Sequence, residues 1–145
     1  MPVDQTQNDK NLFAAAPNLL VDDVIAAAEY YRDKLGFQIG PYARHAETDP
    51  PYFTMVHRDG FFIQLRVTAG DRPRSNKSYV SEACDMYFFV KDVEALYREF
   101  QSNHATIVQE PEDKYYQMRE LQVEDRNGYV LAFATPIHPP HDEKA

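Results

Sequence analysis

The residues best suited to catalysis or metal binding lie scattered along this 145-residue sequence. No two of the five histidines share a strand face or a helix face; they are His45, His57, His104, His138 and His141. No Ser-His-Asp or Cys-His pattern is present, and the five glycines stand singly rather than in a phosphate-binding loop. The single cysteine, Cys84, precedes a predicted strand and is interpreted as a buried structural thiol. The residue types therefore indicate no nucleophile, metal or phosphate motif.

Two strand-turn-strand segments must position the rest of the chain. Residues 119–133 alternate apolar with polar side chains, turn at residues 125–128 and continue as an apolar strand. Asp125 can open this turn by bonding its own backbone, and Asn127 and Gly128 tolerate positive φ at its closing positions. Residues 57–66 repeat the arrangement. Both segments are typical of β-hairpins.

Each hairpin follows a strand and a helix, so the chain contains two copies of one β-α-β-β-β unit. The pattern of residues 18–24 recurs at residues 87–93. The expected strands are 16–21, 37–39, 52–57 and 61–67, then 85–90, 105–108, 115–124 and 129–135. Asp22 or Asp23 can cap the first amphipathic helix and Gly36 ends it, while the second begins at Val93. Residues 110–114 are expected to form a charged loop.

The composition predicts one compact domain. Apolar residues make up 43% of the chain, and 19 Tyr and Phe residues put much of the core into aromatic rings. Residues 1–13 are expected to be a flexible arm, in which Leu12 and Phe13 could contact the body or a partner subunit. The predicted domain spans 14–136, and residues 137–145 form a flexible tail. The domain at 14–136 consists of module 1 at 14–67, a linker at 68–83 and module 2 at 84–136.

Charge and hydropathy restrict the partners. A net charge of −8 argues against nucleic acid and favours a cationic or neutral small ligand. The start of the chain lacks the pattern of a secretory signal, and no stretch approaches the roughly 20 apolar residues of a membrane span. With a single cysteine, these features predict a cytoplasmic protein with no membrane partner.

Three motifs resemble those of the vicinal oxygen chelate superfamily, which includes glyoxalases, extradiol dioxygenases, epimerases and bleomycin resistance proteins. They are the V-x-D-V before each helix, Y-Y-R-D-K-L-G-F at the end of the first helix, and R-E-L-Q-V-E-D-R-N-G before the last strand. The resemblance covers residues 14–136. It implies an α+β, glyoxalase-like fold, in which two tandem β-α-β-β-β modules form a curved mixed sheet around a cleft. It does not fix the function, because this scaffold supports several chemistries.

The same resemblance implies where a metal would bind. Enzymes of this superfamily hold a divalent ion with one His and one Glu from each module, and the corresponding positions here are Ala16, Gln64, Asp85 and Ala132. A carboxylate, an amide and two alanines make a poor site for a transition metal. We therefore interpret the metal site as lost and expect neither a metal nor a cofactor. The pair His138 and His141 could bind a metal adventitiously.

These former metal positions also mark the strand face that the resemblance places toward the cleft. Alternation along the strands then predicts the ligand-binding side chains: Asn18, Phe62, Gln64, Arg66, Asp85, Tyr87, Phe89, Tyr116, Glu120 and Gln122. Aromatic walls with the carboxylates of Asp85 and Glu120 indicate a pocket for a flat, partly cationic molecule. Asp85 is the predicted anchor, because it has no basic neighbour on its own strand.

Two functions remain open. The first is a metal-free protein that sequesters a cationic aromatic drug or metabolite, as the bleomycin resistance branch does, although the stacking Trp residues frequent there are absent. The alternative is a lyase, isomerase or dioxygenase-type enzyme of the same superfamily that uses Asp85, Glu120 or a Tyr as acid or base. Because each module leaves an open sheet edge, we also expect a homodimer.

Overall fold

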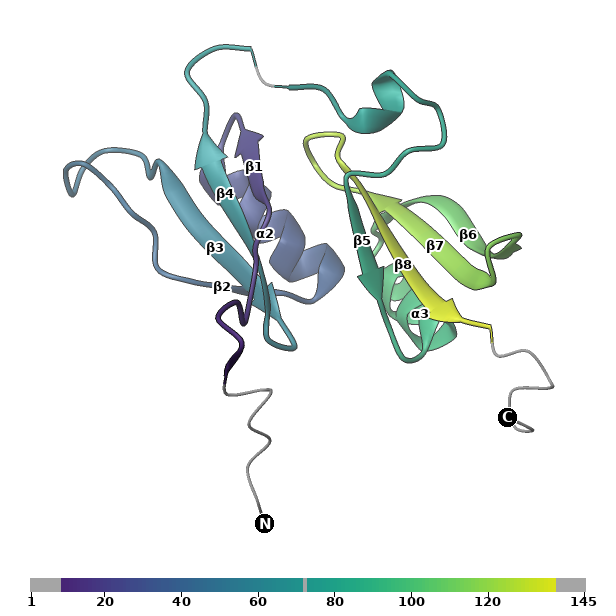
Figure 1. The fold of residues 1–145 in the computed structure, drawn as a ribbon. Coiled ribbons are helices and arrows are strands. Elements are labelled where there is room, and N and C mark those ends of the chain that lie inside the picture. Colours follow the sequence, from purple (N-terminus) through teal and green to yellow (C-terminus); the bar gives the residue numbers. More distant parts are fainter. Residues whose placement is uncertain (1–8, 72, 138–145) are drawn as a thin grey trace.

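The computed structural model describes residues 9–71 and 73–137 and confirms two tandem β-α-β-β-β modules (Figure 1). The first module consists of β1 (Asn18–Val21), α2 (Val24–Leu35), β2 (Gln38–Ile39), β3 (Phe53–Arg58) and β4 (Phe61–Val67). A linker containing one short 3-10 turn, η1 (Asn76–Ser78), follows. The second module consists of β5 (Met86–Phe89), α3 (Val93–Ser102), β6 (Thr106–Lys114), β7 (Met118–Glu124) and β8 (Val130–Pro136).

The predicted arm and tail lie partly outside the described residues. Residues 1–8 of the arm and 138–145 of the tail are outside, including His138 and His141. Leu12 and Phe13 are described, and both side chains are almost fully exposed. None of the described helices has the length and apolar character needed to cross a membrane.

Each module forms its own four-stranded mixed sheet. The strand orders are β1-β4-β3-β2 and β5-β8-β7-β6. The pairs β1–β4 and β5–β8 are parallel, and the hairpin pairs are antiparallel. A parallel pair requires a crossover connection, and α2 and α3 provide part of it. β1 and β5 are therefore sheet edges, and they face each other across the middle of the molecule in Figure 1.

The helix boundaries follow from their caps. The Asp23 carboxylate accepts a hydrogen bond from the Ala26 backbone N–H at 3.0 Å, which resolves the open choice between Asp22 and Asp23. Gly36 ends α2 in the left-handed region, with φ of 77°. The Asp92 carboxylate caps α3 in the same way, through the Ala95 backbone N–H.

The second hairpin turn is closed by Asp125, as predicted. Its Oδ1 accepts hydrogen bonds from the backbone N–H groups of Asn127 and Tyr129, both at 2.9 Å. Only Gly128 has positive φ in this turn, so the expectation that Asn127 would share this conformation is wrong. Asn127 instead donates a side-chain hydrogen bond to the Asp22 carboxylate at 3.0 Å.

The expected charged loop at 110–114 is wrong, because these residues belong to β6. This strand runs along the edge of its sheet and pairs with β7 through two register shifts, the second between Gln109 and Glu112. Pro111 is tolerated there because an edge strand need not donate a ladder hydrogen bond at every residue. The sequence alone suggested a loop because charge and proline are also loop signals.

The modules share one hydrophobic core and are joined by polar contacts across it. In Figure 1, α2 lies between the two sheets. The Tyr31 hydroxyl donates to Asp125 Oδ2 at 2.7 Å, and the Tyr30 hydroxyl donates to the Glu124 carbonyl at 2.9 Å. From the other side, α3 contacts the first hairpin through a two-bond ion pair between Glu99 and Arg58, each bond at 2.8 Å. Each helix therefore contacts the turn of the opposite module.

Candidate functional site

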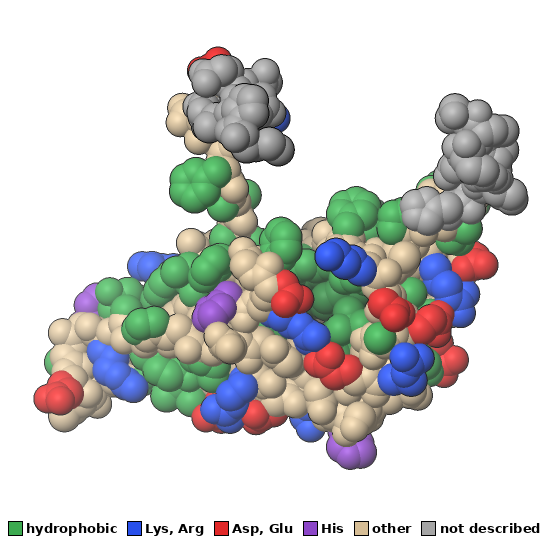
Figure 2. All heavy atoms as spheres, turned by 90° about the horizontal axis from the view of Figure 1, so that it is seen from below, with side chains coloured by type: hydrophobic (Ala, Val, Ile, Leu, Met, Phe, Trp, Pro, Cys, Tyr) green, Lys and Arg blue, Asp and Glu red, His purple; other side chains and the backbone are tan. Residues whose placement is uncertain are grey.

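A groove of about 990 Å³ lies between the two modules, where the β3–β4 hairpin approaches α3. Its lining is mainly aromatic and includes Phe61, Phe62, Tyr87, Phe88, Phe89 and Phe133. The ion pair of Arg58 with Glu99 also lines it. Figure 2 shows this face, with hydrophobic side chains along the hollow and acidic and basic side chains beside them. The volume is in the range of small-molecule pockets.

Three phenylalanines leave this groove apolar and open to solvent. Phe61, Phe62 and Phe89 are 64%, 40% and 74% exposed. Single exposed apolar side chains are common, whereas several gathered in one hollow indicate a surface that contacts a ligand or another protein. Tyr87 lies next to Phe89, with ring centroids 5.3 Å apart, and extends the aromatic wall.

Three polar side chains meet beside this wall at the carboxylate of Glu120. The Tyr87 hydroxyl donates to Glu120 Oε1 at 3.0 Å, and the Tyr116 hydroxyl donates to the same oxygen. Gln122 Nε2 donates to Oε2 at 2.7 Å. The Glu120 side chain is buried, with 2% of the residue exposed. We call Tyr87, Tyr116, Glu120 and Gln122 the Glu120 cluster.

The strand register explains why this cluster forms. Because β8 lies between β5 and β7, Tyr87 and Gln122 are both partners of Ala132, and Glu120 is the partner of Ala134. Both alanines are fully buried. Their small side chains leave room above β8, so the Tyr87 hydroxyl can cross this strand and reach Glu120. Alternation along β7 places Glu120 and Gln122 on the face away from the core.

The tyrosines of the cluster stay protonated at neutral pH. Burial, together with the hydrogen bond to Glu120, raises the pKa of Tyr116 to about 12. The same two causes hold the pKa of Tyr87 well above its usual 10.0. Burial, and next the charge of Glu120, also raises the pKa of Cys84, which is half-buried. The raised pKa disfavours the nucleophilic thiolate, but the side chain is half-buried rather than buried as the sequence predicted.

The positions that correspond to metal ligands do not supply a metal-binding set. Ala16 and Ala132 have no donor atoms, and Gln64 offers only an amide. Among residues 9–71 and 73–137, no three His, Cys, Asp or Glu side chains are grouped so that they could hold a metal ion. The donor set therefore does not fit the divalent ion that the fold holds in metal enzymes.

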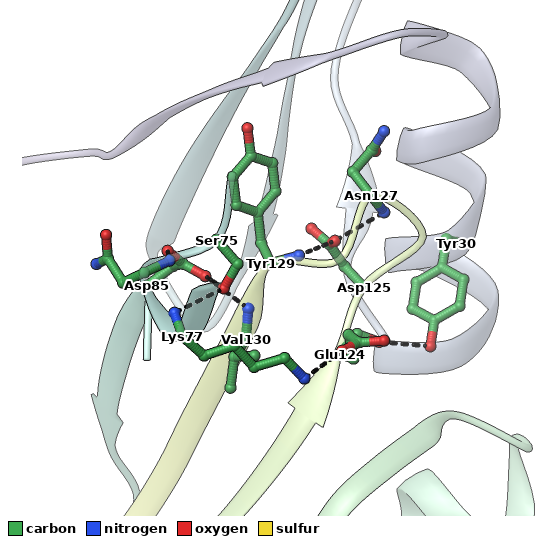
Figure 3. Close-up of polar contacts among 10 residues, drawn as sticks. Tyr30, Ser75, Lys77, Asp85, Glu124, Asp125, Asn127, Tyr129 and Val130 are labelled. Atoms are coloured by element: carbon green, nitrogen blue, oxygen red, sulfur yellow. Dashed lines mark hydrogen bonds and ion pairs between the residues drawn. The ribbon is translucent and has the colours of Figure 1, made fainter. Parts of the chain in front are cut away.

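Asp85, the fourth of these positions, holds the linker in place (Figure 3). Its Oδ2 accepts hydrogen bonds from the Ser75 hydroxyl at 2.6 Å and the Val130 backbone N–H at 2.8 Å. Its Oδ1 accepts a third, from the Asn76 backbone N–H at 2.8 Å. The sequence predicted Asp85 as the ligand anchor, whereas in the structure its carboxylate binds the linker and the first residue of β8. The alternation of residues along the strand of Asp85 could not predict that the linker folds back and binds its carboxylate.

Apart from Asp85, the predicted ligand-binding residues fall into three groups in the structure. Tyr87, Tyr116, Glu120 and Gln122 form the Glu120 cluster, while Phe62 and Phe89 line the groove with Tyr87. Asn18, Gln64 and Arg66 lie in the first sheet. There Asn18 and Gln64 are partners in the β1–β4 register, and the Arg66 guanidinium lies 5.5 Å from the centre of the Tyr52 ring.

Sequence reasoning missed Phe61 and Phe88 as groove residues. Each lies on the strand face opposite to its predicted neighbour, Phe62 or Phe89, so alternation excluded both. They line the groove nonetheless, because β5 is a sheet edge and Phe61 stands at a strand end, next to the turn. The doubled phenylalanine in each module was the signal that could have found them.

Comparison with known proteins identifies the family. The sequence profile described as the Glyoxalase/Bleomycin resistance protein/Dioxygenase superfamily matches residues 13–133, most of the chain. Among curated protein sequences, none matches significantly.

Solved structures with this fold cover nearly the whole chain. TioX from Micromonospora sp. ML1 is 20% identical, with a TM-score of 0.65 over 86% of this chain and 99% of that one. A glyoxalase-related enzyme from Clostridium phytofermentans is 12% identical, with a TM-score of 0.71 over 89% and 98%. A domain from Frankia sp. EAN1pec is 14% identical, with a TM-score of 0.66 over 94% and 100%. The fold and the profile agree, and the chain belongs to the glyoxalase/bleomycin resistance protein/dioxygenase superfamily.

Proposed function

We propose that this protein is a metal-free small-molecule-binding protein of the glyoxalase and bleomycin resistance type, which sequesters a cationic aromatic drug or metabolite. The position of Tyr87 carries the proposal. Its ring lines the aromatic groove and its hydroxyl binds Glu120. One ligand could therefore stack its flat part on the groove wall and direct a charged group toward the Glu120 cluster.

The chemistry of the groove supports a flat aromatic ligand. Phe61, Phe62 and Phe89 present exposed ring surface, and each stacked aromatic pair contributes about 0.5 to 1.5 kcal/mol beyond burial of its area. The net charge of −8 supports a cationic ligand, because a negative protein attracts cations and repels anions at long range. Resistance to an antibiotic would follow if the ligand were a drug.

The alternative, a lyase, isomerase or dioxygenase-type enzyme of the superfamily, has less support. A general base needs an accessible lone pair near the proton it removes. Both carboxylate oxygens of Glu120 already accept hydrogen bonds, and those of Asp85 accept three. These bonds hold both carboxylates in fixed positions and leave them less accessible to a substrate proton.

We further propose a homodimer in the cytoplasm. The exposed side chains of Leu12 and Phe13, together with the open sheet edges, are apolar or unpaired surface that a second copy could cover. Sedimentation equilibrium at micromolar concentration should give twice the chain mass, and deletion of residues 1–13 should weaken the association. A monomer would contradict this assembly.

Titration with 9-aminoacridine, a flat fluorescent cation, tests the binding function. We expect saturable binding that weakens as salt rises, because part of the attraction is electrostatic. Phe89→Ala should weaken binding by about 3- to 10-fold through the lost stacking. Tyr79→Ala is the matched control, because Tyr79 is 76% exposed, close to the 74% of Phe89, but lies in the linker.

Mass spectrometry of the recovered ligand separates binding from catalysis. An unchanged ligand mass after long incubation supports sequestration, whereas a converted product would establish the enzyme alternative. Equal affinities of the Phe89→Ala and Tyr79→Ala variants would show that the groove is not the binding site.

A further inference from the structure

Glu120 is a buried carboxylate without an ion-pair partner in the part of the chain that the structure describes. Its residue is 2% exposed, and the donors to its oxygens are Tyr87, Tyr116 and Gln122, all neutral. Within residues 9–71 and 73–137, no Lys, Arg or His forms an ion pair with it. Burial of a carboxylate is unfavourable unless hydrogen bonds and an opposite charge compensate it. The hydrogen bonds are present here, and the described residues supply no opposite charge.

The two phenols determine what a ligand can meet at this site. Both hydroxyl protons point to Glu120 Oε1, so each phenol oxygen keeps only lone pairs for any further partner. The hydrogen bond to a carboxylate also makes these oxygens stronger acceptors. Tyr116 is 45% exposed, and Tyr87 lines the groove, so both rings can be reached from solvent. The site therefore offers two acceptors over one negative charge.

We propose that the Glu120 cluster is a recognition site for a planar cation with two N–H donors, an amidinium or guanidinium group, carried on the flat body that the groove holds. The two N–H groups bind the hydroxyl oxygens of Tyr87 and Tyr116, and the positive charge of the ligand supplies the counter-ion that Glu120 lacks. This assignment rests on the proposed binding function and adds the chemical group that the ligand must carry.

The same arrangement discriminates against other ligands. A carboxylate or phosphate would meet two acceptor oxygens and a like charge, and both are unfavourable. A neutral amide has only one NH₂ group and gains nothing from the charge of Glu120. An ammonium group gains the charge but cannot match two acceptors with a rigid planar fork.

Three naphthalene compounds of nearly equal shape test the inference: 2-naphthamidine, 2-naphthamide and 2-naphthoate. They differ in charge and donors while the flat body stays constant. In calorimetric or NMR titration, wild type should bind the amidine about 10- to 100-fold more tightly than the amide, the difference expected for hydrogen bonds to a charged group. The naphthoate should bind more weakly than either.

Variants of the cluster should remove this preference and leave the groove intact. Glu120→Gln should reduce the amidine affinity to near that of the amide. If this buried substitution prevents folding, Tyr116→Phe replaces it, because the half-exposed Tyr116 can lose its hydroxyl without a packing change. Tyr115→Phe is the matched control, since Tyr115 is 93% exposed and should leave both affinities unaltered.

The outcomes separate the two proposals. Equal binding of amidine and amide by wild type overturns the amidinium assignment and leaves the groove function standing. An amidine preference that survives in both Glu120→Gln and Tyr116→Phe also overturns it, because the selective group then lies elsewhere. If none of the three compounds binds, the groove function fails and the assignment fails with it.

Discussion

Replacement of Tyr31 by Phe should destabilise the fold by an amount that depends on pH. Tyr31 lies on α2, is 1% exposed, and donates its hydroxyl proton to Asp125 Oδ2 at 2.7 Å. Asp125 is 6% exposed and closes the hairpin turn of the other module. The substitution keeps the ring in the core and removes one donor from a buried carboxylate. A hydrogen bond to a charged group contributes about 1.5 to 3 kcal/mol.

The sign of the pH effect follows from the pKa of Asp125. Burial raises this pKa above 3.8, while the hydrogen bond from Tyr31 acts to lower it. A raised carboxyl pKa means that this group's contribution to stability is fully present below the unfolded pKa and is lost as pH rises through the folded pKa. Near neutral pH the Tyr31 hydroxyl reduces that loss. The Tyr31→Phe variant lacks this hydrogen bond. Its loss of unfolding free energy relative to wild type is therefore largest near neutral pH and becomes smaller as the pH falls.

Urea unfolding of wild type and variant measures this deficit directly. We expect about 2 kcal/mol near pH 7, equivalent to roughly 4 to 8 °C in thermal midpoint, and under about 1 kcal/mol near pH 4, where the carboxyl takes up its proton. Tyr30→Phe is the matched control. The Tyr30 hydroxyl donates to the Glu124 carbonyl and accepts from the Thr106 N–H, and these backbone groups do not titrate. Its deficit should be the same at both pH values. A Tyr31→Phe deficit that is equally insensitive to pH would refute the assignment of the bond to an ionised Asp125.

Two further predictions concern a glycine pair and the metal. A Cβ at Gly36 would lie 2.5 Å from Arg58 Nη1 and 2.6 Å from Glu99 Oε2, whereas one at Gly60 would meet nothing within 4 Å, and both residues have positive φ. In chemical unfolding, Gly60→Ala should lower the unfolding free energy by about 1 to 2 kcal/mol through backbone strain. Gly36→Ala should lower it by about 1 kcal/mol more, because the new Cβ also displaces the ion pair of Arg58 with Glu99. Equal losses in the two variants would mean that this ion pair adds nothing to stability. A chelator should leave the thermal midpoint unchanged, because Ala16 and Ala132 offer no donor. Elemental analysis that finds one transition metal per chain, bound away from the tail histidines, would contradict this.

Local signals in the sequence determined the elements of the fold. Asp23, Gly36 and Gly128 act through their own backbone and near neighbours, so their roles as helix cap, helix end and turn residue could be predicted without a partner. Alternation with a period of two also placed Glu120 and Gln122 on one face of their strand, since this depends on the strand alone. The repeat of these signals indicated the two modules and, through them, the family.

Tertiary structure decided how these residues meet. The Tyr87 hydroxyl reaches Glu120 only because β8 separates their strands in one register and presents Ala132 and Ala134 beneath them, and register is a long-range property. The role of Asp85 depended on a linker that returns to its strand, which no pattern within the strand could show. The groove required the relative placement of two modules that share one core, and sequence alternation carries no information on the contact between sheets.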